Sequence, residues 1–227
     1  MGSTGGNGRL RNLLFCDFDG TITENDNIIE IMKHYSPKGW EAIKNAVLSR
    51  EISVKEGVGK MFALLSSDEK DSIIHFVQKT ASIRNGFKEF VEYAETAGYE
   101  LYIVSGGIDF FVLPMLDGLI EDVPVYCNSA SFENHSIEIL WPHSCDSSCI
   151  NDCGCCKPSI IRKLKEEGDT VTVIGDSVTD LEAAKQADFV IARDYLLDEC
   201  QKLSLRHEAF ADFHDVIQIL EKRRVLA

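Results

Sequence analysis

The hydrophobic residues of this chain follow two rhythms. Residues 13–17 form a short apolar run that ends in polar and glycine residues, which is typical of a buried strand. Over residues 25–80 the apolar side chains instead recur at helical spacing, as in Ile28, Met32 and Tyr35. Ser53 and Glu56 have the separation of a capping box at a helix start. No strand candidate interrupts this stretch, so the pattern predicts an all-helical insertion.

After Gly86 the pattern alternates between helices and strands. A helix is expected to end at Gly98, and strands are expected at residues 99–107, 169–177 and 188–192. Between them, residues 123–143 are rich in β-formers and broken by turn residues, which suggests an antiparallel hairpin. Alternation of this kind indicates βαβ units.

The two rhythms divide the chain into a core and an insertion. Residues 1–24 and 83–227 are expected to form an α/β core built on a Rossmann-like, doubly wound parallel sheet. Residues 25–82 are expected to form an all-helical cap. A chain of 227 residues has room for one core with an insertion rather than for two full domains.

Charge and composition narrow the range of partners. The chain has 23 Lys and Arg against 37 Asp and Glu, a formal net charge of −14, which disfavours nucleic-acid and membrane partners. No apolar run approaches the ~20 residues of a membrane span. The glycine-rich start, interpreted as a disordered tail, lacks the apolar segment of a secretory signal. We therefore expect a cytoplasmic location with reduced thiols, so the eight cysteines do not predict a disulfide framework.

Polar clusters follow three of the expected strands. The clusters are Asp17, Asp19, Gly20 and Thr21; Ser105, Gly106 and Gly107; and Asp176, Ser177 and Asp180. In an open α/β sheet, ligands bind at the carboxyl ends of the strands, so neighbouring strands would bring these clusters into one crevice. Lys157, directly before Pro158 and an expected helix, is a candidate fourth contributor.

These residue types suit a site that binds a metal ion and a phosphoryl group together. Several carboxylates close together require a cation, and an oxygen-rich site suits Mg²⁺. The hydroxyl of Ser105, the amides of Gly106 and Gly107 and the ammonium of Lys157 suit the oxygens of a phosphoryl group. One carboxylate could attack phosphorus while a second acts as general acid and then as general base. The expected substrate is a small phosphate ester.

The same residues carry a resemblance to a known superfamily. "DFDGTIT", "SGG", an isolated Lys and "GDSVTD" resemble, in order, the four motifs of the haloacid dehalogenase superfamily of aspartate-nucleophile phosphatases, and the insertion resembles that superfamily's first type of cap. The resemblance implies that Asp17 is the nucleophile that becomes aspartyl-phosphate and that Asp19 is the acid and base. It implies a Mg²⁺ ion held by Asp17, the backbone carbonyl of Asp19, and Asp176.

The resemblance also implies roles for the remaining polar residues. Ser105 and Lys157 would hold the phosphate, together with the glycine-rich turns. Asp180 would orient Lys157 or a metal-bound water, and Thr21 would support its loop. The residues given a phosphate-binding role are Gly20, Thr21, Ser105, Gly106, Gly107 and Lys157, with Ser177 and Asp180 in support.

A longer local similarity narrows the expected substrate. "HSCDSSCINDCGCCKPS", "EGVGKMF" and "SGGIDFFV" resemble the 2-hydroxy-3-keto-5-methylthiopentenyl-1-phosphate phosphatase family of bacterial methionine salvage. That resemblance implies dephosphorylation of an enol phosphate to the acireductone 1,2-dihydroxy-3-keto-5-methylthiopentene. Within the cap, Trp40, Met61, Phe62 and Leu65 are more often core residues than pocket residues at such spacing, and Phe110 and Phe111 are candidates for a methylthio pocket.

Two other functions are open on the sequence. A phosphoserine phosphatase shares the motif order, but its substrate needs a carboxylate partner, and Arg50 and Arg84 are the only arginines in or bordering the expected cap. A phospho-accepting signalling module also combines an acidic Mg²⁺ site with a Ser or Thr and a Lys. Such modules are about half as long and lack a cap, and Asp19 is placed to activate water, which argues against a long-lived phosphoaspartate.

A cysteine-rich segment lies just before Lys157. Five cysteines fall within twelve residues, with His143 upstream: Cys145, Cys149, Cys153, Cys155 and Cys156. Thiolates at such spacing can bind zinc, but paired C-x-x-C motifs are absent from the sequence. Zinc binding, redox-sensitive thiols and a simply packed loop are all open, and the sequence favours the packed loop.

Overall fold

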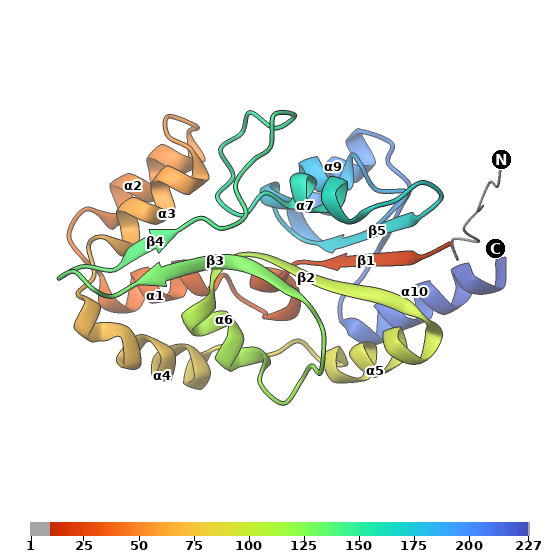
Figure 1. Ribbon diagram of the computed structural model, residues 1–227, viewed down its shortest axis with the longest axis horizontal. Helices are drawn as coiled ribbons and strands as arrows, with labels where there is room; N and C mark the ends of the chain where they lie inside the picture. Colours follow the sequence, from red (N-terminus) through yellow and green to blue (C-terminus); the bar gives the residue numbers. More distant parts are fainter. Residues whose placement is uncertain (1–9, 227) are drawn as a thin grey trace, which may run out of the picture.

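The computed structural model describes residues 10–226, so the expected tail at residues 1–9 lies outside the described residues. Its centre is a seven-stranded sheet in the order β4-β3-β2-β1-β5-β6-β7 (Figure 1). Neighbouring strands are parallel except β3 and β4, which pair antiparallel. The strands are β1 Asn12–Cys16, β2 Tyr99–Ile108, β3 Val125–Ser131, β4 Glu138–Leu140, β5 Thr170–Gly175, β6 Phe189–Ala192 and β7 His207–Ala209.

Helices cover both faces of the sheet because its strands are apolar on both sides. In β1, Leu13 and Phe15 join one hydrophobic cluster, whereas Leu14 and Cys16 join the other. The first cluster includes side chains from α7 (Lys157–Leu164) and α8 (Leu181–Ala184), which therefore cover one face of the sheet. α9 (Asp194–Lys202) lies on the same face. The other face carries α5 (Phe87–Ala97), α6 (Asp109–Leu116) and α10 (Phe213–Leu226) (Figure 1). A sheet buried on both faces is the doubly wound architecture that the sequence predicts.

The strand predictions are confirmed by β1, β2, β5 and β6, and the expected hairpin is formed by β3 and β4. β3 also pairs in parallel with β2 and so extends the central sheet. Helix α5 ends at Gly98, which adopts a left-handed φ of 76°. The short edge strand β7, with the sequence His-Glu-Ala, carries no hydrophobic pattern and was not expected.

The segment after β1 is helical, as the periodicity predicts. It contains α1 (Asn27–Tyr35), α2 (Trp40–Leu48), α3 (Val54–Phe62) and α4 (Lys70–Thr80). The Ser53 hydroxyl accepts a hydrogen bond from the Glu56 amide at 3.0 Å, which caps α3. An antiparallel bridge between Thr23 and Ile83 brings the two ends of the segment together at the sheet.

These helices share their hydrophobic core with the rest of the chain. α4 packs on α6, and α3 packs on β4. The Phe62 ring meets the Phe110 ring edge-on at 6.2 Å. The residues weighed as pocket candidates, Trp40, Met61, Phe62, Leu65, Phe110 and Phe111, are all buried in one continuous cluster. The division at residues 24/25 and 82/83 therefore describes chain connectivity and remains a prediction as a domain boundary.

Candidate active site

Three adjacent strands bring the expected polar clusters to one edge of the sheet. Asp17 directly follows β1, Asp176 directly follows β5, and Ser105 lies near the end of β2. Because β2, β1 and β5 are neighbours and all parallel, their carboxyl ends open on the same side. Lys157 arrives from α7, whose first residue it is. The structure thus brings together every site residue that the sequence singles out.

Lys157 and two carboxylates form a buried ionic group. The Nζ of Lys157 lies 2.6 Å from Oδ1 of Asp17 and 2.6 Å from Oδ1 of Asp180, and all three side chains are buried. Burial by itself would lower the pKa of Lys157, but the two carboxylates outweigh it, so the pKa of Lys157 is raised. The lysine therefore remains a cation and fixes the position of the Asp17 carboxylate.

Both carboxylate oxygens of Asp180 accept hydrogen bonds. Oδ1 accepts from Lys157, and Oδ2 accepts from the amides of Asp176 and Ser177 at 3.2 and 3.0 Å. The Ser177 hydroxyl adds a third hydrogen bond to Oδ2 at 3.2 Å. This network fixes the turn after β5, which carries Asp176.

Asp19 is turned away from that ionic group. Its Oδ1 accepts hydrogen bonds from the side-chain and backbone nitrogens of Asn27, at 2.7 and 3.1 Å. Its Oδ2 lies 3.4 Å from the Ser105 hydroxyl. Burial, followed by the nearby charge of Asp26, raises the pKa of Asp19 to about 7, while Asn27 opposes the rise. A carboxyl group with that pKa can both hold and release a proton near neutral pH.

The turn after Asp19 is shaped to receive Asp176. Gly20 has φ 80°, and a Cβ atom at Gly20 would overlap the Asp176 carboxylate. The Thr21 hydroxyl donates to Oδ1 of Asp176 at 2.7 Å, so in this structure it supports a carboxylate. Burial and the charge of Asp180 raise the pKa of Asp176 to about 6. The carboxylates of Asp17, Asp176 and Asp180 offer oxygen atoms within 4.8 Å of one another.

The expected turn at Gly106 and Gly107 is instead part of strand β2, and this end of β2 lies against Asp19. The Gly107 amide donates to the Ser105 hydroxyl at 2.8 Å, and a Cβ atom at Gly107 would lie 2.8 Å from Oδ2 of Asp19. The buried Asn128 side chain, in β3, donates to the Gly106 carbonyl at 2.7 Å and so fixes the end of β2. At position 107, only a residue without a side chain allows β2 and the Asp19 loop to approach so closely.

Sequence reasoning missed the residues that hold these loops. Arg84 is buried, and its guanidinium donates to the carbonyls of Thr21 and Gly20 at 2.8 and 2.9 Å. Asn27 holds Asp19, and Asn128 holds Gly106. A buried polar residue is unremarkable in the sequence, because only the folded chain shows which distant carbonyl or carboxylate it contacts. The one sequence signal was the position of Arg84 at the edge of the insertion.

Comparison with known proteins identifies the family. The profile of the haloacid dehalogenase-like hydrolase family matches residues 14–185, which include the last three residues of β1, all of β5 and all the motif residues. The chain belongs to the haloacid dehalogenase-like hydrolase family. A protein of Geobacillus thermodenitrificans named 2-hydroxy-3-keto-5-methylthiopentenyl-1-phosphate phosphatase is 57% identical over 95% of this chain and 98% of its own length. A protein of the same name from Bacillus pumilus is 55% identical over 90% of this chain and 88% of its own length.

Solved structures of two phosphoserine phosphatases share the fold. A phosphoserine phosphatase from T. onnurineus superposes with a TM-score of 0.69 at 16% identity, covering 92% of this chain and 94% of that one. A substrate-bound phosphoserine phosphatase gives a TM-score of 0.70 at 19% identity, covering 93% and 99%. At this identity the likeness shows the fold, and the Rossmann-like α/β core of the haloacid dehalogenase-like hydrolases is confirmed.

Proposed function

We propose that this chain is a Mg²⁺-dependent phosphatase that hydrolyses 2-hydroxy-3-keto-5-methylthiopentenyl-1-phosphate to 1,2-dihydroxy-3-keto-5-methylthiopentene in methionine salvage. The assignment of this substrate rests on 57% identity to a relative named as the phosphatase for it, over nearly the whole of both chains. The reaction type is supported by the site, in which Asp17 is held by a lysine while Asp19 has a pKa of about 7.

Asp17 would act as the nucleophile. Its carboxylate attacks the phosphorus atom, the bond from phosphorus to the enol oxygen breaks, and an aspartyl-phosphate forms. Lys157 holds Asp17 in place and supplies positive charge beside the phosphoryl oxygens, while Asp180 fixes the lysine. The Ser105 hydroxyl, the turn at Gly20 and the Gly106–Gly107 end of β2 would complete the phosphate-binding surface.

Asp19 would move the protons of both steps. Its proton passes to the departing enol oxygen, which leaves as the enediol product. The resulting carboxylate then takes a proton from water, whose oxygen attacks the phosphorus atom and releases inorganic phosphate and free Asp17. The two hydrogen bonds from Asn27 to Oδ1 hold the carboxyl group in one orientation, with Oδ2 on the side of Ser105.

The donor set fits Mg²⁺. Asp17 and Asp176 offer carboxylate oxygens, and the proposed third protein ligand is the backbone carbonyl of Asp19. Asp180 is the poorer candidate because both its oxygens already accept hydrogen bonds. When bound, the ion would supply positive charge that offsets the clustered carboxylates and attracts the phosphoryl group.

Two observations favour this function over phosphoserine hydrolysis. The guanidinium of Arg84 is occupied by backbone carbonyls of the Asp19 loop, so it has no free face for a substrate carboxylate. Arg50 is exposed after α2, in a turn with φ 62°. We therefore propose that residues 25–82 cover the site as a cap selecting an apolar methylthio tail rather than an amino acid.

A substrate panel tests the proposal. Initial phosphate release should be measured for the methylthiopentenyl enol phosphate, phosphoserine and several simple phosphate monoesters at equal concentrations with Mg²⁺. We expect the highest kcat/KM for the enol phosphate. A clear preference for phosphoserine would overturn the substrate, and a stable acyl phosphate without turnover would favour a signalling module.

A further inference from the structure

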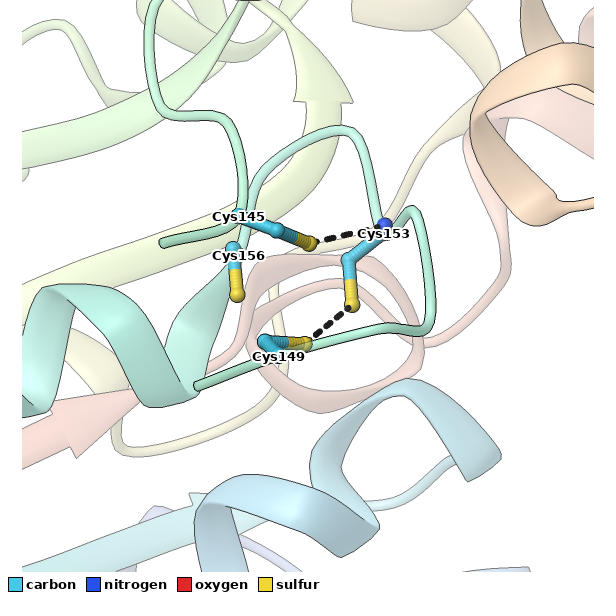
Figure 2. A group of neighbouring side chains, drawn as sticks. All are labelled: Cys145, Cys149, Cys153 and Cys156. Atoms are coloured by element: carbon cyan, nitrogen blue, oxygen red, sulfur yellow. Dashed lines mark hydrogen bonds between the residues drawn. The ribbon is translucent and has the colours of Figure 1, made fainter. Parts of the chain in front are cut away.

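Four cysteine side chains converge in the long loop between β4 and α7. Cys145, Cys149, Cys153 and Cys156 point toward a common centre, as Figure 2 shows. Their sulfur atoms all lie within 4.8 Å of one another. The loop gathers them from twelve residues by reversing direction at Asp152 and Gly154, which have φ values of 49° and 81°.

The sulfur atoms are close enough to one another to be ligands of one ion. Cys149 and Cys153 have a sulfur–sulfur distance of 3.7 Å. Four thiolates at about 2.3 Å from a tetrahedral zinc ion are about 3.8 Å apart. A disulfide requires about 2.05 Å, and all four cysteines are free.

Cys155, the fifth cysteine of the segment, differs from the other four because its side chain packs in the hydrophobic core. Cys155 is buried, packs in the hydrophobic cluster with Phe15 and Val104, and directs its sulfur toward the Tyr126 carbonyl at 3.6 Å. The four converging cysteines belong to none of the hydrophobic clusters formed by the described residues, and three of them are only partly buried. Apolar packing therefore explains Cys155 but does not explain why the other four sulfurs meet.

Hydrogen-bond donors surround the sulfur atoms. The Cys153 amide donates to the sulfur of Cys145 at 3.4 Å, and the Ser159 hydroxyl donates to the sulfur of Cys156 at 2.9 Å. Arg162 donates to that hydroxyl at 3.1 Å while it also pairs with Asp146, so it orients the Ser159 donor at the edge of the cluster. Donors of this kind stabilise thiolates and orient metal ligands.

We propose that Cys145, Cys149, Cys153 and Cys156 bind one zinc ion in a closed, structural site. Four thiolates fill the tetrahedral shell of zinc and leave no open position for a substrate. Binding displaces the thiol protons into solvent. The site is distinct from the carboxylate site, which offers oxygen rather than sulfur ligands.

The four cysteines lie between the segment that carries Lys157 and the start of α3, so a bound ion would stabilise the contact between these two parts. Cys156 directly precedes Lys157 at the N-cap position of α7, so a fixed Cys156 fixes the backbone that delivers Lys157 to Asp17. On the other side, Asp152 accepts a hydrogen bond from Ser53 at 2.8 Å and pairs with Lys55 at 3.2 Å, at the start of α3. Zinc would thus hold the loop that joins the proposed catalytic lysine to the helical insertion.

Elemental analysis of the full chain tests the proposal. The protein should be produced with zinc in the medium, purified without a metal-affinity step, and measured by mass spectrometry for zinc and iron. We expect about one zinc ion per chain, retained in Cys155→Ser and in Asp176→Asn, and lost in Cys149→Ser/Cys153→Ser. Absence of zinc, iron in its place, equal loss in Cys155→Ser, or a Cys149–Cys153 disulfide would overturn it.

Two further measurements apply to the unaltered protein, in case the double variant fails to fold. Titration with a mercurial thiol reagent should release zinc in proportion to the thiols modified, as read with a chromogenic zinc chelator. Replacement of zinc by Co²⁺ should produce the visible bands and thiolate charge-transfer band of tetrahedral cobalt with four sulfur ligands. A spectrum of six-coordinate cobalt with oxygen ligands would contradict the sulfur site.

Discussion

The ammonium group of Lys157 lies 2.6 Å from the carboxylate of Asp17, and both side chains are buried. The pair joins the first strand of the sheet to a helix that begins 140 residues later. Asp180 contacts the same ammonium group, so the lysine compensates two buried carboxylates at once. Its removal would leave like charges facing each other out of water.

Lys157→Met should impair both activity and stability. Breaking a buried ion pair typically costs about 3–5 kcal/mol of unfolding free energy, and loss of the positive charge should reduce kcat by about 10²–10³. Urea denaturation and phosphate release measure the two effects. Lys165→Met is the matched control, because Lys165 forms a partly exposed pair with Asp188 and should change stability by less than about 1 kcal/mol. Equal effects in both variants would contradict the role of Lys157.

Asp17→Asn should abolish turnover and prevent formation of an aspartyl-phosphate, because an amide is a poor nucleophile while its oxygen can still accept from Lys157. Trapping with a radiolabelled substrate, followed by peptide mapping, measures the intermediate. Asp188 is exposed, and the control variant Asp188→Asn should retain both turnover and formation of the aspartyl-phosphate. Substantial turnover by Asp17→Asn would exclude Asp17 as the nucleophile.

Asp19→Asn should slow the reaction by about 10²–10⁴, the usual contribution of a general acid and base. In the unaltered enzyme, kcat/KM should fall as the pH rises through about 7, because deprotonated Asp19 cannot protonate the leaving oxygen. A pH–rate profile in the presence of Mg²⁺ checks this. If Asp19→Asn keeps the same alkaline limb, that limb belongs to another group.

Metal binding should change how stability depends on pH. Burial raises the pKa values of Asp19 and Asp176 to about 7 and about 6, so the metal-free folded chain holds protons that the unfolded chain releases. The unfolding free energy of the metal-free protein should therefore fall as the pH rises from about 4 to about 7. At pH 8, Mg²⁺ at a concentration of 100 times its Kd should raise the unfolding free energy by about 2.7 kcal/mol. Thermal unfolding with and without Mg²⁺ measures this, and Asp176→Asn should respond much less. An unchanged Tm on adding Mg²⁺ would contradict the site.

Gly20→Ala should reduce activity through the position of Asp176. The added methyl group would overlap the Asp176 carboxylate, and overpacking of this kind costs about 1–3 kcal/mol. Gly39→Ala separates this effect from backbone strain, because Gly39 also has a positive φ but has open space around it. Both variants should lose some stability, and only Gly20→Ala should lose affinity for Mg²⁺. Equal Mg²⁺ affinity in the two variants would mean that the overlap is relieved without moving Asp176.

The fold could be predicted to the extent that it follows from local pattern. Apolar runs ending in Asp-x-Asp and Gly-Asp-Ser located β1 and β5, and helical spacing located α1 to α4. The edge strand β7 could not be predicted, since His207–Ala209 has no apolar alternation and is a strand only because β6 offers its hydrogen-bonding edge. Likewise, nothing in the sequence indicates that Phe62, in the insertion, would contact Phe110, in the rest of the chain.

The sequence by itself determined the residue types of the site and their order. Asp17, Asp19, Lys157 and Asp176 are specified by short motifs, because each chemical task needs a particular group at the end of a strand or the start of a helix. The tertiary structure alone decided which groups compensate one another. It placed Arg84 on the carbonyls beside Gly20, Asn27 on Asp19, and four cysteines around one point, where the sequence had favoured a packed loop. Coulomb attraction, hydrogen bonding and metal ligation act over a few ångströms in space, and only folding brings distant parts of the chain within that range.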